Sequence, residues 1–242
     1  MIVLSVGMPR AGSGWHYNLI HDLMKTTGCA DAREIREQYR LQGILTEVNC
    51  NIGVLSLRRL VMVAVPALAG VTFVIKAHAG PTIWSRLLST MGLLRTTYIY
   101  RDPRDAMLSA YEYGQRALEK GRPNAFSHLS DFEKSLAFMQ EYVRIWEKWQ
   151  AEKGVLVARY EDLLQDYDAE SARLAEFLQL DGSRPEIQKV IEGYRPGKAE
   201  GQQGLHFYKG KIGRFRESYT AEQQAILVEH FGSYLQKMGY KI

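Results

Sequence analysis

Short apolar runs alternate along the chain with longer segments in which apolar residues recur every three or four positions. The short runs predict four buried strands, at Ile2–Val6, Val71–Ile75, Thr96–Tyr100 and Val155–Ala158. The longer segments predict helices, the first of them over Trp15–Lys25. Strands that alternate with helices are typical of a parallel sheet covered on both faces. We therefore expect an α/β fold with a central parallel β-sheet flanked by helices, in a single domain over residues 1–242.

Capping residues predict where the later helices begin. Asp102-Pro103 predicts a helix start directly after the third strand. Ser130–Glu133 and Thr220–Gln223 have the spacing of capping boxes, which open two further helices. The last helix is expected to end near Gly239. Residues 193–213 are rich in Gly, Gln and Lys and predict a long loop.

The composition is that of a globular protein and gives a first indication of the ligand. With 46% hydrophobic and 24% charged residues among 242, disorder, collagen and coiled coil are excluded. The net charge of +4 and the pI near 8.9 are mildly basic, which suits a phosphorylated small molecule. The sequence has no Lys/Arg-rich stripe with interleaved aromatic residues, so no nucleic-acid partner is expected.

The cysteines and the apolar stretches of the chain indicate its cellular compartment. Cys29 and Cys50 are too few for a disulfide framework and lack metal-ligand spacing, which indicates a reducing compartment. The N-terminus reads as a strand and not as a signal peptide, so a cytoplasmic protein is expected. The most apolar stretch, Leu60–Ile75, is shorter than the ~20 residues that span a bilayer. It predicts either a buried helix or a lid over an apolar acceptor; peripheral membrane contact and the oligomeric state are left open.

Glycines cluster between the first strand and the first helix. Gly7 and Gly12 have the spacing of a P-loop, in which backbone N–H groups at a helix start bind phosphate. Ser13 stands where the P-loop lysine belongs, and the positive charge lies inside the loop on Arg10. The loop predicts an anion site, although such turns also occur without a ligand. A nucleoside triphosphate with Mg²⁺ fits this pattern poorly.

Three further segments indicate which class of reaction this anion site serves. Phe73–His78 is an apolar strand that ends in Lys-x-His, Tyr98–Tyr111 carries an arginine at a strand end and a serine on the following helix, and Phe207–Gly213 carries Lys-Gly. Together with Pro9–Trp15 and Tyr160–Leu163, in this order, they resemble the sulfotransferases that use 3′-phosphoadenosine 5′-phosphosulfate (PAPS). The resemblance implies the P-loop-like sulfotransferase fold, with adenosine 3′,5′-bisphosphate (PAP) as the nucleotide product.

PAPS carries an anion at each end, so the resemblance implies two phosphate sites. Arg101 and Ser109 match the pair that holds the 3′-phosphate, where a forked guanidinium is favoured. Ser13 matches the hydroxyl at the 5′-phosphosulfate, and Trp15 and Tyr194 match aromatic residues near the adenine. The residues implied in nucleotide binding are Arg10, Ala11, Gly12, Ser13, Gly14, Trp15, Arg101, Ser109, Tyr160, Tyr194, Lys209 and Gly210.

Sulfuryl transfer moves a neutral SO3 unit to a hydroxyl or amine, so the acceptor must lose a proton and the leaving phosphate must be stabilised. By resemblance, His78 is the general base, Lys76 contacts the sulfuryl oxygens and Arg10 stabilises the released phosphate. Lys76 and His78 are two residues apart on a strand and share a face. The transferred group carries less charge than a phosphoryl group, so no metal ion is expected.

The chain also departs from the family pattern. Arg10 stands where relatives usually carry lysine, Tyr208 where they carry arginine, and Gly14 where the loop has a second threonine. The expected acceptor is a small or lipid-like molecule in a more open site, and a carbohydrate is left open. The residues by themselves are also compatible with two other functions: a P-loop kinase for a small metabolite, and a non-catalytic nucleotide-binding module.

Overall fold

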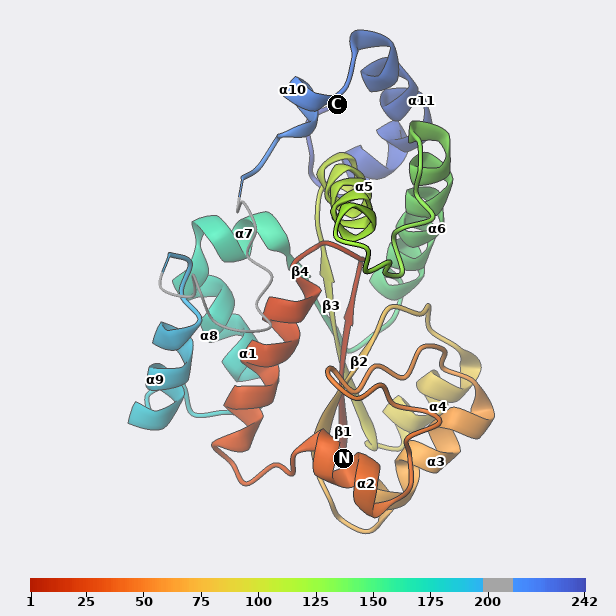
Figure 1. The fold of residues 1–242 in the computed structure, drawn as a ribbon. Coiled ribbons are helices and arrows are strands. Elements are labelled where there is room, and N and C mark those ends of the chain that lie inside the picture. The colour runs from red at the N-terminus through yellow and green to blue at the C-terminus, as the bar shows by residue number, and fades with distance from the viewer. Residues whose placement is uncertain (198–210) are drawn as a thin grey trace.

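A parallel sheet of four strands runs through the centre of the molecule (Figure 1). The computed structural model describes residues 1–197 and 211–242. The strands lie in the order β2-β1-β3-β4, with the bounds β1 Ile2–Gly7, β2 Phe73–Ala77, β3 Leu94–Tyr100 and β4 Val155–Arg159. Every pairing is parallel, so the carboxyl ends of all four strands lie at the same end of the sheet. The predicted α/β architecture is confirmed.

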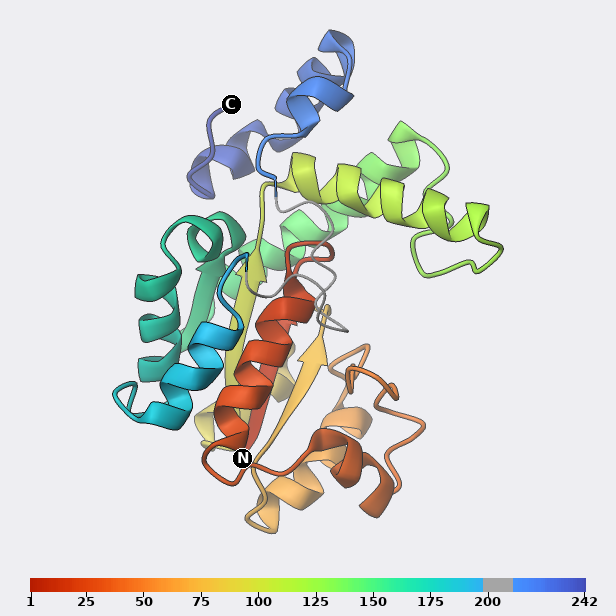
Figure 2. The same cartoon turned by 60° about the vertical axis from the view of Figure 1, so that its left-hand side comes forward.

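Helices cover both faces of the sheet (Figures 1 and 2). One face carries α1 (Ser13–Lys25), α7 (Tyr160–Gln165), α8 (Tyr167–Phe177) and α9 (Pro185–Gly193). The remaining helices are α2 (Ala32–Gln38), α3 (Leu57–Leu68), α4 (Ile83–Thr90), α5 (Pro103–Glu119), α6 (Phe132–Gln150), α10 (Phe215–Ser218) and α11 (Ala221–Lys237). Because strand side chains alternate, Val3 and Val74 join the core under α1, whereas Leu4 and Ile75 join the core under α3 and α6. No helix within the described ranges is long and apolar enough to cross a membrane.

Two of the three predicted helix starts are confirmed, and the third is wrong by one residue. The side chain of Asp102 caps α5, and Thr220 forms a capping box on α11. On α6 the cap is Asp131, whose carboxylate accepts from the Lys134 N–H, while the Ser130 hydroxyl donates to Asp131. A carboxylate is the stronger acceptor and is favoured by the positive end of the helix dipole.

The second strand begins two residues later than the apolar run predicts. Gly70 has a φ of 85° and follows the end of α3. The N–H of Val71 donates to the Pro66 carbonyl of that helix, so Val71 belongs to the turn that terminates α3. The stretch Leu60–Ile75 is therefore the greater part of one helix, its turn and the first half of β2.

Candidate active site

The predicted site residues follow the carboxyl ends of the four strands. β1 leads into the loop 8–12, β2 into His78, β3 into Arg101 and β4 into Tyr160. The parallel registers keep these ends adjacent. Ligands of parallel α/β sheets bind at this position, so the fold brings the predicted residues to one place.

The loop after β1 depends on both glycines of the P-loop spacing. Gly12 has a φ of 74°, and a Cβ there would lie 2.6 Å from Cδ2 of Tyr160. A Cβ on Gly7 would lie 2.7 Å from Cβ of Ser13. Gly12 is the N-cap of α1 and offers no side chain to the first-turn N–H groups. These groups carry the positive end of the helix dipole and suit an anion.

Arg10 connects this loop to α5. Its Nε donates to the Ser109 hydroxyl at 3.3 Å, and its guanidinium lies over the Tyr113 ring, 4.3 Å from the centroid. Burial lowers the pKa of Arg10, and the nearby Arg101 and Arg116 lower it further; an arginine nevertheless keeps its charge. Sequence reasoning missed Tyr113. Its signal is the spacing of one helical turn from Ser109, which places both side chains on one face of α5.

Arg101 has an incomplete set of partners. Its Nη2 donates to the Lys211 carbonyl at 2.8 Å and pairs with Asp105 at 3.4 Å, while the guanidinium lies 4.7 Å from the Tyr160 ring centroid. Its Nε is buried and has no hydrogen-bond partner among the described residues. A buried guanidinium N–H without a partner is costly, and a phosphate oxygen would satisfy it.

Asp105 anchors the segment that follows the undescribed residues. Its carboxylate accepts from the N–H groups of Gly213 at 2.6 Å and Phe215 at 3.1 Å. At the same helix start, Arg104 and Asp102 form a buried ion pair, with Nη2 and Oδ2 2.8 Å apart. The predicted ligands Lys209 and Gly210, and the departure at Tyr208, lie outside the described residues.

The structure places Lys76 and His78 beside the loop after β1. His78 Nδ1 donates to the Gly7 carbonyl at 2.6 Å, which leaves Nε2 as an acceptor. Burial, reinforced by the Lys76 ammonium, lowers the pKa of His78 to about 4. Burial and the Arg10 guanidinium lower the pKa of Lys76 to about 8. The imidazole is therefore neutral at pH 7, because its pKa is well below the ordinary value near 6.5.

His16 is a second buried histidine near Lys76, and sequence reasoning missed it. Its Nδ1 lies 3.4 Å from the Ser5 hydroxyl, and its Nε2 is buried without a partner among the residues described. Burial lowers the pKa of His16 to about 3, and Lys76 contributes to the shift. No sequence motif marks His16, because its proximity to the site comes from the packing of α1 on the sheet.

The two predicted adenine contacts lie together. Trp15 Nε1 donates to the Tyr194 carbonyl at 3.0 Å, and the Tyr194 hydroxyl donates to Asp22 at 2.6 Å. The Trp15 ring is buried, stacks on Tyr167 with centroids 6.0 Å apart, and meets Tyr160 edge-on. These two hydrogen bonds hold Tyr194 against α1. The contact of either aromatic ring with an adenine stays a prediction.

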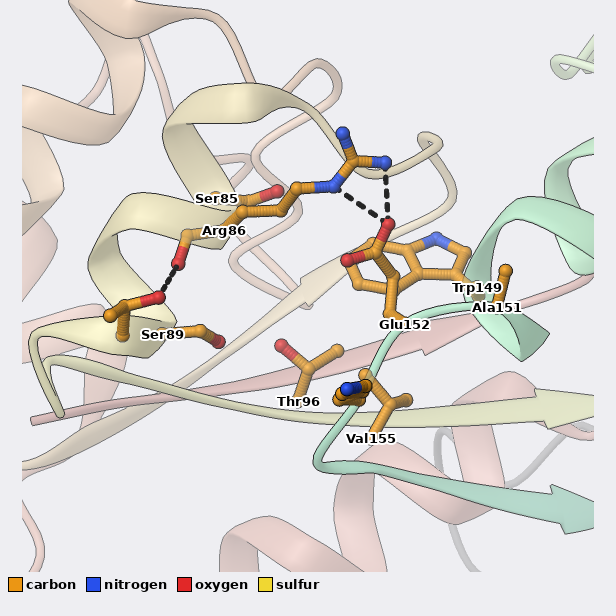
Figure 3. A pocket seen from close by; sticks show the side chains of 10 residues that line it. Ser85, Arg86, Ser89, Thr96, Trp149, Ala151, Glu152 and Val155 are labelled. Atoms are coloured by element: carbon orange, nitrogen blue, oxygen red, sulfur yellow. Dashed lines mark hydrogen bonds and ion pairs between the residues drawn. The ribbon is translucent and has the colours of Figure 1, made fainter.

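A cavity of about 400 Å³ lies away from this site, between α4 and the amino ends of β3 and β4 (Figure 3). Thr96, Val155 and Glu152 line it, and none of the predicted site residues that the structure describes does. Within residues 1–197 and 211–242, no group of three His, Cys, Asp or Glu side chains could hold a metal ion.

The loops at the carboxyl ends of the strands thus form one site, which contains the cationic side chains of Arg10 and Arg101. The sequence profile of the sulfotransferase domain matches residues 2–239. The chain therefore belongs to the sulfotransferase family.

Solved structures share this fold at low sequence identity. Retinol dehydratase, solved with retinol and PAP, is 18% identical with a TM-score of 0.62, covering 97% of this chain and 81% of that one. A second structure of retinol dehydratase, with androsterone and PAP, has a TM-score of 0.59 at 19% identity, covering 97% and 80%. Mouse sulfotransferase SULT7A1, solved with PAP, has a TM-score of 0.60 at 15% identity, covering 97% and 84%. Comparison with curated protein sequences found no match.

Proposed function

We propose that this protein transfers the sulfuryl group of PAPS to a hydroxyl or amine of a small acceptor, which places it among sulfotransferases and not among P-loop kinases. The observation that carries the proposal is the 3.3 Å contact between Arg10 Nε and the Ser109 hydroxyl. It joins the loop expected to bind the 5′-phosphosulfate to the helix expected to bind the 3′-phosphate. One nucleotide with an anion at each end could therefore reach both sites.

The described residues fit such a donor. The first turn of α1 and Arg10 would hold the 5′-phosphosulfate. The 3′-phosphate would be held by Ser109 and by the Nε of Arg101, which has no hydrogen-bond partner in the described part of the chain. Tyr160 lies between the two proposed anion sites, because its ring contacts both Arg101 and the position of Gly12. The relatives of this fold solved with PAP support the same nucleotide.

In the proposed reaction His78 takes the proton of the acceptor. The hydrogen bond from Nδ1 to the Gly7 carbonyl directs the basic lone pair to Nε2 and stabilises the imidazolium once it forms. Lys76 would neutralise charge on the sulfuryl oxygens and Arg10 charge on the leaving phosphate. A neutral SO3 unit needs less charge compensation than a phosphoryl group, so we propose that no metal ion takes part.

The proposed acceptor is a small apolar alcohol. One relative of this fold, retinol dehydratase, was solved once with retinol and once with androsterone, both of which are apolar alcohols. In this chain the segment that leads into β2 and the helix that follows it are rich in apolar side chains, and several of them are exposed. The class of acceptor can be tested with labelled PAPS and a panel of apolar alcohols, phenols and sugars.

Calorimetric titration tests the nucleotide assignment directly. PAP is expected to bind, and adenosine 5′-monophosphate, which lacks the 3′-phosphate, is expected to bind roughly 10- to 100-fold more weakly, since charged hydrogen bonds contribute ~1.5–3 kcal/mol each. Arg101→Ala should abolish this preference, and Arg184→Ala, at an exposed arginine on the distant start of α9, should keep it. Absence of PAP binding at millimolar concentration would refute the proposal.

A further inference from the structure

The outward faces of α3 and α4 carry apolar side chains where a globular protein usually presents polar ones. On α3, Leu57, Val61, Val65 and Leu68 recur at helical spacing, and Val61 and Leu68 are 54% and 66% exposed. Ile83 and Leu87 on α4, together with its C-cap residue Met91, form a second stripe with 67%, 50% and 58% exposure. The two helices contact each other (Figure 1), and their two apolar stripes together are here termed the α3–α4 face.

The charged residues of the segment that contains α3 and α4 are all basic. Residues 48–101 contain no Asp or Glu, although the chain has 27 of them. The same segment contains six lysines and arginines, of which Arg58, Arg59 and Arg86 lie on α3 and α4. Arg86 pairs with Glu152, which comes from beyond α6 (Figure 3). An apolar surface bordered by cations complements an anionic, apolar partner.

A cationic cavity opens beside the apolar stripe of α3. It has a volume of about 340 Å³ and is lined by Arg40, Arg58 and Arg59 together with Met62. Arg59 also donates to the Ile52 carbonyl, and among the described residues none of the three guanidinium groups pairs with a carboxylate. Guanidinium groups that no carboxylate of the described residues neutralises are suited to bind a phosphate oxygen.

We propose that the α3–α4 face docks on the surface of an anionic phospholipid membrane, with the apolar stripes in the interface and a lipid phosphate in the arginine cavity. A second copy of this chain fits less well, because a twofold interface would place the arginines of one face against those of the other. Exposed Trp84 on α4 is also of the residue type enriched at membrane interfaces.

Docking would bring the membrane close to the proposed site. The Thr82 hydroxyl, at the start of α4, donates to the Leu55 carbonyl at 2.8 Å and so joins the starts of α3 and α4. His78 lies four residues before Thr82 on the same strand-to-helix connection. An apolar acceptor dissolved in the membrane would then lie near the strand ends, but the docking itself does not depend on the proposed reaction.

Co-sedimentation with vesicles tests the docking. The protein is expected to bind vesicles of phosphatidylcholine with phosphatidylserine and not vesicles of phosphatidylcholine alone. Val61→Glu/Leu68→Glu should weaken binding roughly tenfold or more, because the protein loses two apolar side chains that docking would bury in the membrane. Arg58→Gln should weaken it about fivefold, the effect of one charge near an anionic surface. Leu118→Glu, at an exposed leucine on α5, is the control for adding a surface carboxylate and should bind like the parent protein.

Trp84 provides an independent readout. Of the four tryptophans, Trp84 is 38% exposed and the other three are buried, so a blue shift of emission on adding anionic vesicles reports burial of this face. Protein that binds PAP but neither type of vesicle would overturn the docking while leaving the proposed function intact. Equal binding to neutral vesicles, or a dimer that Val61→Glu/Leu68→Glu dissociates, would also overturn it.

Discussion

His78 Nε2 is the atom on which the proposed proton transfer depends, because Nδ1 is committed to the Gly7 carbonyl. His78→Gln removes the basic nitrogen and is expected to lower kcat by ~10²- to 10⁴-fold, the usual contribution of a general base. PAP affinity should change little, since His78 is not among the proposed nucleotide ligands. His230→Gln, at an exposed histidine on α11, serves as the control. Retention of kcat by the His78 variant would assign the proton transfer to another group.

The pKa values of His78 and Lys76 predict a pH profile. Neutral imidazole is the active base, so kcat/KM should fall only as the pH drops through about 4, the lowered pKa of His78. The Lys76 ammonium loses its charge as the pH rises through about 8, which should produce the alkaline limb. Steady-state rates across this range measure both limbs, which report the free enzyme.

Lys76→Arg separates the two assignments, because an arginine keeps its charge to much higher pH. The alkaline limb should move upward in this variant while the acid limb stays in place. A limb near 8 that persists in Lys76→Arg would show that another group titrates there.

At the scale of the element, the turn from β1 to α1 combines a left-handed backbone with a crowded side-chain position. Gly12→Ala should destabilise the protein by ~1–3 kcal/mol and weaken PAP binding, because its Cβ would meet the Tyr160 ring. Gly28 also has a positive φ, of 81°, but apart from its chain neighbours no atom of the described residues lies within 4 Å of its Cβ position. Gly28→Ala should therefore lower the free energy of unfolding only by the cost of a left-handed backbone at alanine, ~1 kcal/mol. It should leave PAP binding unchanged. Urea unfolding and titration would detect the difference, and equal effects of the two substitutions would contradict it.

Local patterns were sufficient to predict most elements. The end of β3 and the start of α5 follow from an apolar run and from Asp102-Pro103, because both signals lie within a few residues of the structure they determine, although β3 begins at Leu94, two residues before the predicted Thr96. The start of α6 was misplaced because Ser130 and Asp131 are adjacent cap formers, and only their hydrogen bonds distinguish them. The start of β2 was misplaced because an apolar residue, Val71, serves in a turn.

Contacts between distant segments could not be predicted from the sequence in the same way. The motif residues Arg10 and Ser109 were identified, but their mutual contact depends on the order of strands in the sheet. Asp105 holds the chain at Gly213, more than a hundred residues away, and no local pattern encodes that pairing. The lowered pKa of His78 likewise results from burial in the folded protein, which a motif does not report.

At the scale of the whole molecule, the proposed nucleotide site joins segments that are far apart in the sequence. The loop after β1, the end of β3, α5 and the start of α7 all contribute, and Asp105 couples them to the chain after residue 211. Such a site exists only in the folded state. A nucleotide that binds there therefore stabilises the entire fold and not a single element.

This linkage predicts a thermal shift. PAP at about 100 times its Kd should stabilise the protein by ~2.7 kcal/mol, which corresponds to roughly 5–10 °C in Tm for a chain of this size. Adenosine 5′-monophosphate at the same concentration should give a smaller shift, because it lacks the phosphate that would accept a hydrogen bond from Arg101 Nε. In Arg101→Ala the two nucleotides should give equal, small shifts, whereas Arg184→Ala should respond like the parent protein. Differential scanning fluorimetry measures all of these. A full PAP shift in Arg101→Ala would mean that the 3′-phosphate lies elsewhere, because the stabilisation could then not come from this guanidinium.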